Sequence, residues 1–335
     1  MLATLAFVNP HRGSAWTYLR VPATVPRPHA AAERPLDLAE FHTATATTAF
    51  QVLVEGVLVH AWYANGLGPH DLFLGASATK SVLAHVVGRA GLDLDAPVDA
   101  YVPELPGYRG VSVCDVARMT SGVDWVEDHR DPHGPATALV GAFATGGSSR
   151  ALLTRVGARY PPGTRYAYCT ADSQVLDWVR ERATGVAFPD ALAQLWRDLG
   201  CTEDAMVAVD GDGVALAGGG VSAAAGDWAR IGMLQIDGAW ADASSRPSLP
   251  FLRPGRLPPP LSRHVGFGYH WWPLDGDGAR VAADGSRGQF VYVDRPRRTV
   301  VVKTSAWAYA DPAYDAHCRD LSYRTFPTIV ERVAR

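Results

Sequence analysis

The sequence has little of what marks the more specialised classes of protein. Only four of its 335 residues are cysteines, and they lie far apart, at Cys114, Cys169, Cys201 and Cys318. Their spacing fits neither a disulfide framework nor a metal site. We therefore expect free thiols, no bound metal and a cytoplasmic location.

The chain also has no large excess of charge of one sign and no long apolar run. The formal net charge is only -3, which argues against a general nucleic-acid binder. No apolar run reaches the length that a membrane span needs. Residues 1–8 are apolar, but they have no basic region before them and no cleavage site after them, so we do not expect a secretory signal. We expect neither a nucleic-acid nor a membrane partner, and the oligomeric state stays open.

Two common site motifs are absent as well. The chain has no Gly-x-Ser-x-Gly sequence, although this does not exclude a Ser-His-Asp arrangement. The glycine-rich segment 211–222 lacks a P-loop lysine, so it predicts a turn-rich loop and not a phosphate site. His129, His133 and His270 lie in segments that could face a cleft, but isolated histidines are more often surface or capping residues.

Regular secondary structure is expected along most of the chain. Two apolar runs flank Glu55-Gly56 within residues 51–63, which predicts a β-hairpin. Residues 1–40 predict an irregular arm, and the prolines of 246–260 predict a surface loop. Strands are predicted over 267–273, 289–294 and 299–304. Helices are predicted over 112–122, 135–158 with a break at 146–149, 173–182, 188–199, 223–234 and 315–333.

This order of elements predicts the fold class. Strands at both ends of the chain, with helices between them, imply an α+β sandwich whose antiparallel sheet is built from both termini. We expect one catalytic unit over 1–335 with two lobes. An α/β lobe would comprise about 1–90 and 210–335, and a mostly helical lobe about 91–209. The junction of two lobes is a common place for a catalytic cleft.

The most informative segment contains Ser77 and Lys80. On a helix, residues three apart share one face, so the hydroxyl lies within reach of the amine. Burial lowers the pKa of a lysine, and a neutral lysine can take the proton of a serine nucleophile. The amides at the helix N-terminus favour developing negative charge. This is the Ser-x-x-Lys pattern of penicillin-recognising enzymes. The alternative is a capping serine with a solvated lysine.

The order of several motifs resembles one family. Ser77-x-x-Lys80 is followed by segments 119–122, Pro162-Gly163-Thr164, 228–232 and 285–289. Together they resemble the serine beta-lactamase-related hydrolases, nearest to the 6-aminohexanoate-oligomer hydrolases and the class C beta-lactamase-like esterases. The resemblance covers about residues 45–330. It implies a beta-lactamase/transpeptidase-like fold and a reaction without metal or organic cofactor.

By this resemblance, Tyr168-Cys169-Thr170 is the second motif of the family. The resemblance implies that Tyr168 passes a proton to the leaving group, and we expect nearby charges to lower its pKa. Thr170 replaces the usual Asn or Ser and would still bond Lys80. The alternative for Tyr168 is an aromatic residue packed beside Tyr166.

The third motif corresponds to Ala283-Asp284-Gly285, where the family's basic residue is missing. The resemblance implies that the backbone amides of Ser286 and Ser77 form an oxyanion hole. We place Trp125, Thr170, Asp284 and Gly285 among the substrate-binding residues, with Gly285 allowing close approach of a substrate. Trp125 could form an aromatic wall of the cleft or belong to the core. Its neighbours Asp124, Glu127 and Asp128 are expected to be solvated, although the resemblance implies that their loop borders the substrate.

These residues predict a serine hydrolase that cleaves a small amide or ester. Ser77 would form the acyl-enzyme, with Lys80 and Tyr168 as general base and acid. One alternative is an acyltransferase that passes the acyl group to an amine or alcohol in natural-product assembly. Another is a binding protein that keeps the fold without catalysis. The sequence does not identify the acyl or leaving group.

Overall fold

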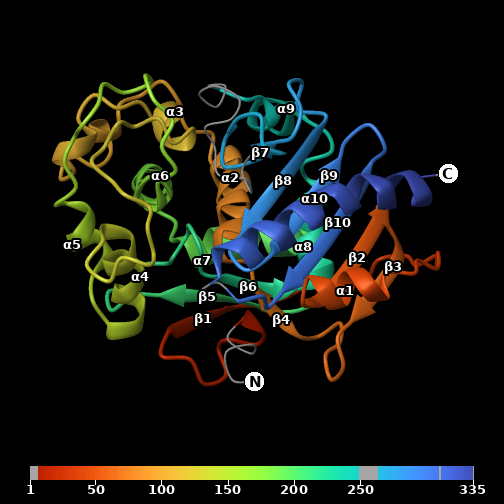
Figure 1. Cartoon of the computed structure of the whole chain (residues 1–335). Coiled ribbons are helices and arrows are strands. Elements are labelled where there is room, and N and C mark those ends of the chain that lie inside the picture. Colours follow the sequence, from red (N-terminus) through yellow and green to blue (C-terminus); the bar gives the residue numbers. More distant parts are fainter. Residues whose placement is uncertain (1–6, 249–262, 309–310, 335) are drawn as a thin grey trace.

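A six-stranded antiparallel sheet joins the two ends of the chain in the computed structural model, which describes residues 7–248, 263–308 and 311–334 (Figure 1). Its strand order is β3-β2-β10-β9-β8-β7. The pairing of β10 with β2 places Val302 opposite Gln51, so the sheet is built from both termini, as predicted. The strands are β2 (Thr47–Val54), β3 (Val57–Tyr63), β7 (Trp272–Pro273), β8 (Arg280–Gly285), β9 (Gln289–Asp294) and β10 (Thr299–Ser305).

The predicted hairpin is confirmed, and the prediction for 267–273 is wrong over most of its length. Glu55 and Gly56 join β2 to β3 with φ angles of 50° and 82°. Two consecutive positive φ angles match the right-handed twist of the strands on either side. Within 267–273 only Trp272–Pro273 forms a strand. His270 has a φ of 57°, and this left-handed residue interrupts the extended backbone just before β7.

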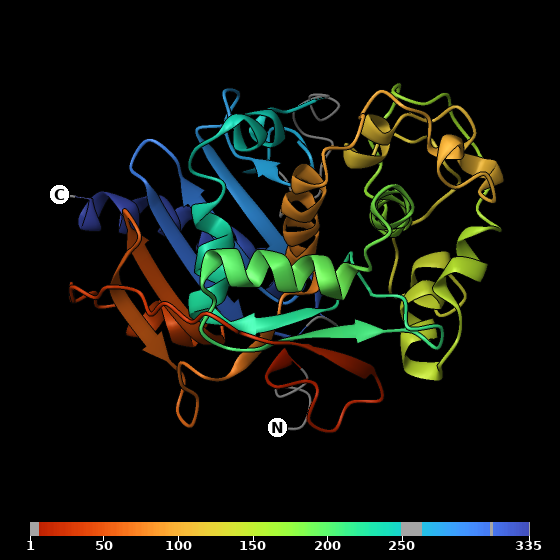
Figure 2. The same cartoon turned by 180° about the vertical axis from the view of Figure 1, so that it is seen from behind.

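Helices bury both faces of this sheet. Alternate residues of β9 point to opposite sides: Phe290 packs in the cluster beneath α10, whereas Val291 packs in the cluster around α2. Figure 1 shows α10 lying across one face, and Figure 2 shows α2 and α8, in orange and teal, on the other. The covering helices are α1 (Ala39–Ala44) and α10 (Pro312–Val333) on one face, and α2 (Thr79–Arg89) and α8 (Ala225–Met233) on the other.

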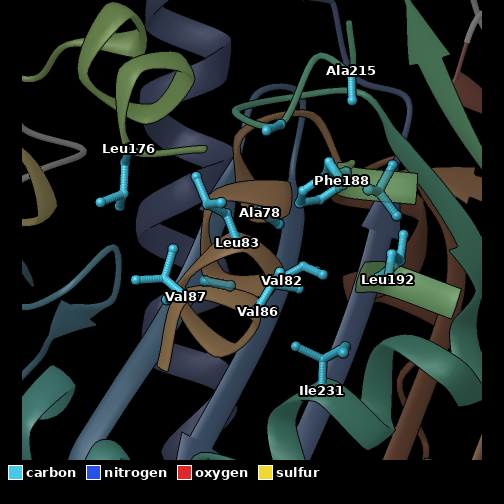
Figure 3. Packing of buried hydrophobic residues seen from close by; sticks show 14 of the residues in the cluster. Ala78, Val82, Leu83, Val86, Val87, Leu176, Phe188, Leu192, Ala215 and Ile231 are labelled. Atoms are coloured by element: carbon cyan, nitrogen blue, oxygen red, sulfur yellow. The ribbon is translucent and has the colours of Figure 1, made fainter. Parts of the chain in front are cut away.

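The helix α2 lies at the centre of the larger core cluster. Its apolar side chains Val82, Leu83, Val86 and Val87 are all buried, and Figure 3 shows them facing residues of several other helices. Such burial contributes about 1.5–3 kcal/mol for each large side chain. The segment that carries Ser77 and Lys80 is therefore fixed on a rigid element.

A second, four-stranded sheet was not predicted. Its order is β1-β5-β6-β4, and β1 lies within the region expected to be an irregular arm. Thr17 of β1 pairs with Val209 of β5, so β1 has a partner only because a segment far along the chain comes beside it. The strands are β1 (Thr17–Val21), β4 (Leu72–Leu74), β5 (Ala205–Val209) and β6 (Val221–Ala224).

Glycines end the middle helices, as their sequence pattern predicted. Gly146, Gly185 and Gly200 each adopt a left-handed conformation at a helix C-terminus, which glycine does without a steric penalty. The helix predicted over 112–122 is shorter, because the left-handed Met119 cannot continue it. These helices are α3 (Val113–Ala117), α4 (Pro135–Thr145), α5 (Ser149–Leu153), α6 (Thr170–Thr184), α7 (Phe188–Leu199) and α9 (Ala239–Ser245).

Three expectations from the sequence are not tested by this architecture: the surface loop, the two lobes and the cellular location. Residues 249–260 of the predicted surface loop lie outside the described residues. The division into two lobes stays a prediction, as does the cytoplasmic location. Within the described ranges, no helix combines the length and apolar character that crossing a bilayer requires.

Candidate active site

Ser77 lies in a tight turn between β4 and α2. The turn is a short 3-10 helix, Ala76–Ala78, and Ala76 within it has a φ of 45°. A left-handed conformation costs a non-glycine residue about 1–2 kcal/mol, and strain of this kind gathers at functional sites. Gly75 precedes it, and a Cβ there would lie 2.3 Å from the ring of Trp228. The turn therefore holds Ser77 in a defined position at the wall of a cavity.

Lys80 is buried and its amine contacts Ser77. The Nζ atom lies 3.3 Å from Ser77 Oγ, 3.1 Å from Thr170 Oγ1 and 2.7 Å from the carbonyl oxygen of Gly218. A neutral amine has two N–H donors and one lone pair. If the donors bind Gly218 and Thr170, the lone pair faces the Ser77 hydroxyl. This arrangement suits removal of the serine proton.

The surroundings of Lys80 lower the pKa of its amine, as expected from the sequence. Burial lowers its pKa to about 8, although the negative charge of Glu127 acts in the opposite direction. Desolvation disfavours the charged ammonium. At pH 7 the charged form still predominates, but about one Lys80 in ten is neutral, a far larger fraction than for an ordinary lysine.

Tyr168 lies beside Lys80, but its pKa is shifted in the direction opposite to our expectation. Its ring centre is 5.1 Å from Lys80 Nζ, and it stacks on Trp272 at 5.6 Å. We expected a lowered pKa. Burial instead raises the pKa of Tyr168 well above its ordinary value, and the charge of Glu127 raises it further, while a hydrogen bond with Ser77 opposes the shift. Tyr168 is thus a protonated phenol in the resting site and can give a proton but not take one.

Glu127 is the main residue that sequence reasoning missed. We expected it to be solvated, yet only 13% of its side chain is exposed. It accepts hydrogen bonds from the Thr170 hydroxyl and from the Thr170 amide, the latter at 2.8 Å. Burial raises its pKa, but His129, Lys80 and Thr170 outweigh this and lower it to about 2. Thr170 therefore links the amine of Lys80 to a buried negative charge.

The expected aromatic wall, Trp125, contacts Glu127. Its indole Nε1 donates to Glu127 Oε2 at 2.6 Å, and it does not line the cavity beside Ser77. His129 lies 3.0 Å from Glu127 Oε1 and does line that cavity. The dense charge of this loop was the only feature of the sequence that pointed to Glu127. Charge density alone does not distinguish a solvated carboxylate from a buried one.

Gly285 brings the end of β8 against the turn that carries Ser77. A Cβ on Gly285 would lie 2.2 Å from the carbonyl oxygen of Gly75 and 3.1 Å from the amide of Ala78. We expected Gly285 to allow approach of a substrate, but the close approach is to the protein backbone. Ser286, the next residue, lines the same cavity as Ser77.

The carboxylate of Asp284 is held by the protein and does not line this cavity. It pairs with Arg319 and accepts a hydrogen bond from Tyr323 at 2.7 Å. Burial raises the pKa of Asp284, but Arg319 and His264 lower it to about 2. The side chain that we placed among the substrate-binding residues therefore anchors β8 to α10.

The other two candidate histidines, His133 and His270, lie away from the cavity. His270 is buried, with Nδ1 2.8 Å from the carbonyl oxygen of Ala117 and Nε2 3.0 Å from Ser173 Oγ. Burial lowers its pKa to about 3, so it is neutral. His133 is exposed. Neither of them lines the cavity.

The cavity beside Ser77 has a volume of about 470 Å³, within the range of about 300–1,000 Å³ of small-molecule sites. Ser77, Lys80, Thr170, Gly218 and Ser286 form its polar side. A serine hydroxyl, a buried amine and a phenol meet where a turn adjoins the end of a sheet strand. This fold and this arrangement of side chains define a serine hydrolase of the beta-lactamase-like class.

Comparison with known proteins supports the same class of protein. The chain belongs to the beta-lactamase family, whose family model matches residues 37–322. It is 32% identical to the 6-aminohexanoate-dimer hydrolase of Paenarthrobacter ureafaciens over 324 residues, which covers 87% of this chain and 82% of that protein.

Solved structures have the same fold. One from Bacillus anthracis, described as a candidate 6-aminohexanoate-dimer hydrolase, superposes with a TM-score of 0.80 at 19% identity and covers 98% of this chain and 94% of its own. Simvastatin synthase from Aspergillus terreus superposes with a TM-score of 0.63 at 17% identity, covering 88% of this chain and 98% of its own. The predicted family and fold class are confirmed.

Proposed function

We propose that the protein hydrolyses a small amide or ester through an acyl-enzyme on Ser77. The observation that carries this proposal is the contact of 3.3 Å between Lys80 Nζ and Ser77 Oγ, made by an amine whose pKa burial lowers to about 8. The name of the relative that is 32% identical also supports an amide substrate.

In the first step, Ser77 Oγ attacks the carbonyl carbon and its proton passes to the neutral amine of Lys80. The carbonyl oxygen gains negative charge, which the backbone amides of Ser77 and Ser286 would stabilise. Donors aimed at such an oxygen are worth about 3–4 kcal/mol each. The contact of Gly285 with Gly75 supports a fixed spacing between the two amides.

In the second step, the bond to the leaving group breaks and the leaving amine or alcohol takes a proton from the Tyr168 phenol. The Lys80 ammonium returns a proton to Tyr168, so Tyr168 never stays ionised, in keeping with its raised pKa. Water then attacks the acyl-enzyme with Lys80 again as the base, and Ser77 regains its proton.

The test is turnover of p-nitrophenyl acetate, with labelling by a fluorophosphonate. We expect Ser77→Ala to lower kcat by at least about 10³-fold and to abolish labelling. Ser286→Ala is the matched control, because it removes a hydroxyl from the same cavity and keeps the backbone amide. Activity retained by Ser77→Ala would contradict the proposal. Acylated product, formed in place of free acid when an amine or alcohol is added, would indicate the acyltransferase alternative.

A further inference from the structure

The N-terminal part of the chain builds one wall of the cavity beside Ser77. Phe7, Trp16 and Tyr18 line this wall. Trp16 and Tyr18 pack on a cluster that contains the buried Leu216. Pairing of β1 with β5 sets Tyr18 opposite Ala208. Tyr18 lies on β1, so the four-stranded sheet fixes the position of this part of the wall.

The cavity offers apolar surface and no anionic partner. Leu74, Val140 and Leu216 add to the aromatic wall, and none of the described residues that line the cavity is Asp or Glu. The basic side chains on it are Lys80, His129 and Arg287. The carboxylate of Glu127 lies near this cavity, but it already accepts hydrogen bonds from Thr170 and Trp125. An ammonium group placed in the cavity would therefore lose its hydration without gaining a carboxylate on the cavity wall. An apolar group would gain about 0.8 kcal/mol for each buried CH₂.

The position of the cavity indicates which half of a substrate it holds. In the proposed reaction the leaving group contacts Tyr168, because the phenol protonates it. Tyr168 does not line the cavity, whereas Thr170 and Ser286 do. The cavity therefore lies on the side of the carbonyl that carries the acyl group.

We propose that this cavity is an acyl-binding site that selects an uncharged, apolar acyl group, with residues 7–18 as its specificity wall. The proposal rests on the proposed acyl-enzyme function and narrows its substrate class. It implies that an acyl chain ending in an ammonium group, as in a 6-aminohexanoyl group, is a poor substrate for this chain.

Two esters of the same shape test the charge preference. They are p-nitrophenyl 7,7-dimethyloctanoate and p-nitrophenyl 6-(trimethylammonio)hexanoate, which differ by a carbon atom in place of a charged nitrogen. We expect kcat/KM of the wild-type protein to be at least about tenfold higher for the neutral ester. Such a factor corresponds to about 1.4 kcal/mol, which is modest for the burial of a cation.

A variant should change the preference in a defined direction. Val140 lines the cavity from α4, so Val140→Asp adds a carboxylate to its wall. We expect the ratio of kcat/KM, neutral over cationic, to fall at least about tenfold. Ala138→Asp is the matched control, because Ala138 is on the same helix and exposed, and the ratio should not change.

The outcomes separate the two proposals. Hydrolysis of p-nitrophenyl acetate that depends on Ser77, combined with equal or higher kcat/KM for the cationic ester, would overturn the acyl site and leave the proposed function intact. The acyl site would also be overturned if Ala138→Asp changed the ratio as much as Val140→Asp does. Hydrolysis that persists in Ser77→Ala, or none of any ester by the wild-type protein, would overturn the proposed function and the acyl site with it.

Discussion

At the residue scale, the site depends on the charge of one buried lysine. Lys80 loses hydration by burial, which lowers its pKa, and Glu127 partly restores the charged form. Thr170 stands between them, since its hydroxyl accepts a hydrogen bond from Lys80 and donates one to Glu127. Two opposing effects therefore set the fraction of Lys80 that is neutral and able to act as a base.

The first prediction concerns pH. Because Lys80 acts only when neutral, kcat/KM should rise with pH and level off above about pH 8, the value to which burial lowers its pKa. With an ordinary lysine, this rising limb of the kcat/KM profile would lie near pH 10.5, the reference pKa of lysine. The raised pKa of Tyr168 keeps the phenol protonated over the same range. Initial rates of ester hydrolysis from about pH 6 to 10 measure the limb. A limb still rising at pH 10 would contradict this assignment.

The second prediction concerns Glu127. Its charge raises the pKa of Lys80, so Glu127→Gln should move the limb of the kcat/KM profile to lower pH. Asp124→Asn is the control, because Asp124 lies in the same loop with its carboxylate exposed and paired with Arg159, and its profile should match that of the wild-type protein. A limb that stays in place or moves to higher pH in Glu127→Gln would show that the two groups are not coupled.

At the scale of secondary-structure elements, the site requires β8 to end beside the turn of Ser77. Gly285 allows this contact because it has no side chain. The preceding residue, Asp284, ties β8 to α10 through Arg319 and Tyr323. A buried ion pair is costly to break from one side, since the remaining charge has neither water nor a partner.

The third prediction tests this anchor. Arg319→Met removes the guanidinium partner of the buried Asp284 and leaves it only Tyr323 and the neighbouring His264. The free energy of unfolding, measured by urea denaturation, should fall by about 3–5 kcal/mol. Adding Asp284→Asn to the same protein should recover part of the loss. Arg182→Met is the control, because its pair with Glu104 is exposed on both sides and such pairs contribute at most about 1 kcal/mol. Losses of similar size in the two single variants would contradict the proposed anchor.

At the scale of the whole molecule, the cores on the two faces of the main sheet contain neutral histidines. Burial lowers the pKa of His85 to about 3 and that of His42 to about 4. His42 stacks on Trp62 at 4.0 Å, and His85 lies 5.8 Å from Trp271, edge to face. With His270, these rings stay neutral in the folded protein at a pH where the unfolded chain would protonate them.

The fourth prediction follows from this difference. Below the ordinary value of 6.5 these three histidines bind protons in the unfolded state but not in the folded state, so their contribution to the free energy of unfolding should decrease as pH falls from about 6.5 towards 4. The buried carboxyl group of Asp172, whose pKa burial raises to about 7, acts in the opposite direction. Each buried histidine contributes up to about 1.4 kcal/mol per pH unit. Urea denaturation at several pH values measures the slope. His85→Gln should make the slope shallower, whereas His133→Gln, at an exposed position, should not. An unchanged slope in His85→Gln would contradict the prediction.

Local spacing and composition were enough to predict much of this protein. The hairpin at Glu55-Gly56, the helix ends at Gly146 and Gly185, and the shared helix face of Ser77 and Lys80 all depend on residues close together in the chain. Strand signals at both ends also predicted that the main sheet joins the termini. These features could be predicted because their geometry follows from backbone preferences and from the periods of helix and strand.

Other features were decided only by the tertiary structure. The partner of β1 lies far along the chain at β5, and Glu127 is buried because Thr170 and Trp125 surround it. The raised pKa of Tyr168 and the apolar wall built by residues 7–18 likewise depend on distant segments. Sequence spacing determines what one element can present, but burial and charge at a site are sums over all the elements that meet there. That meeting exists only in the folded chain.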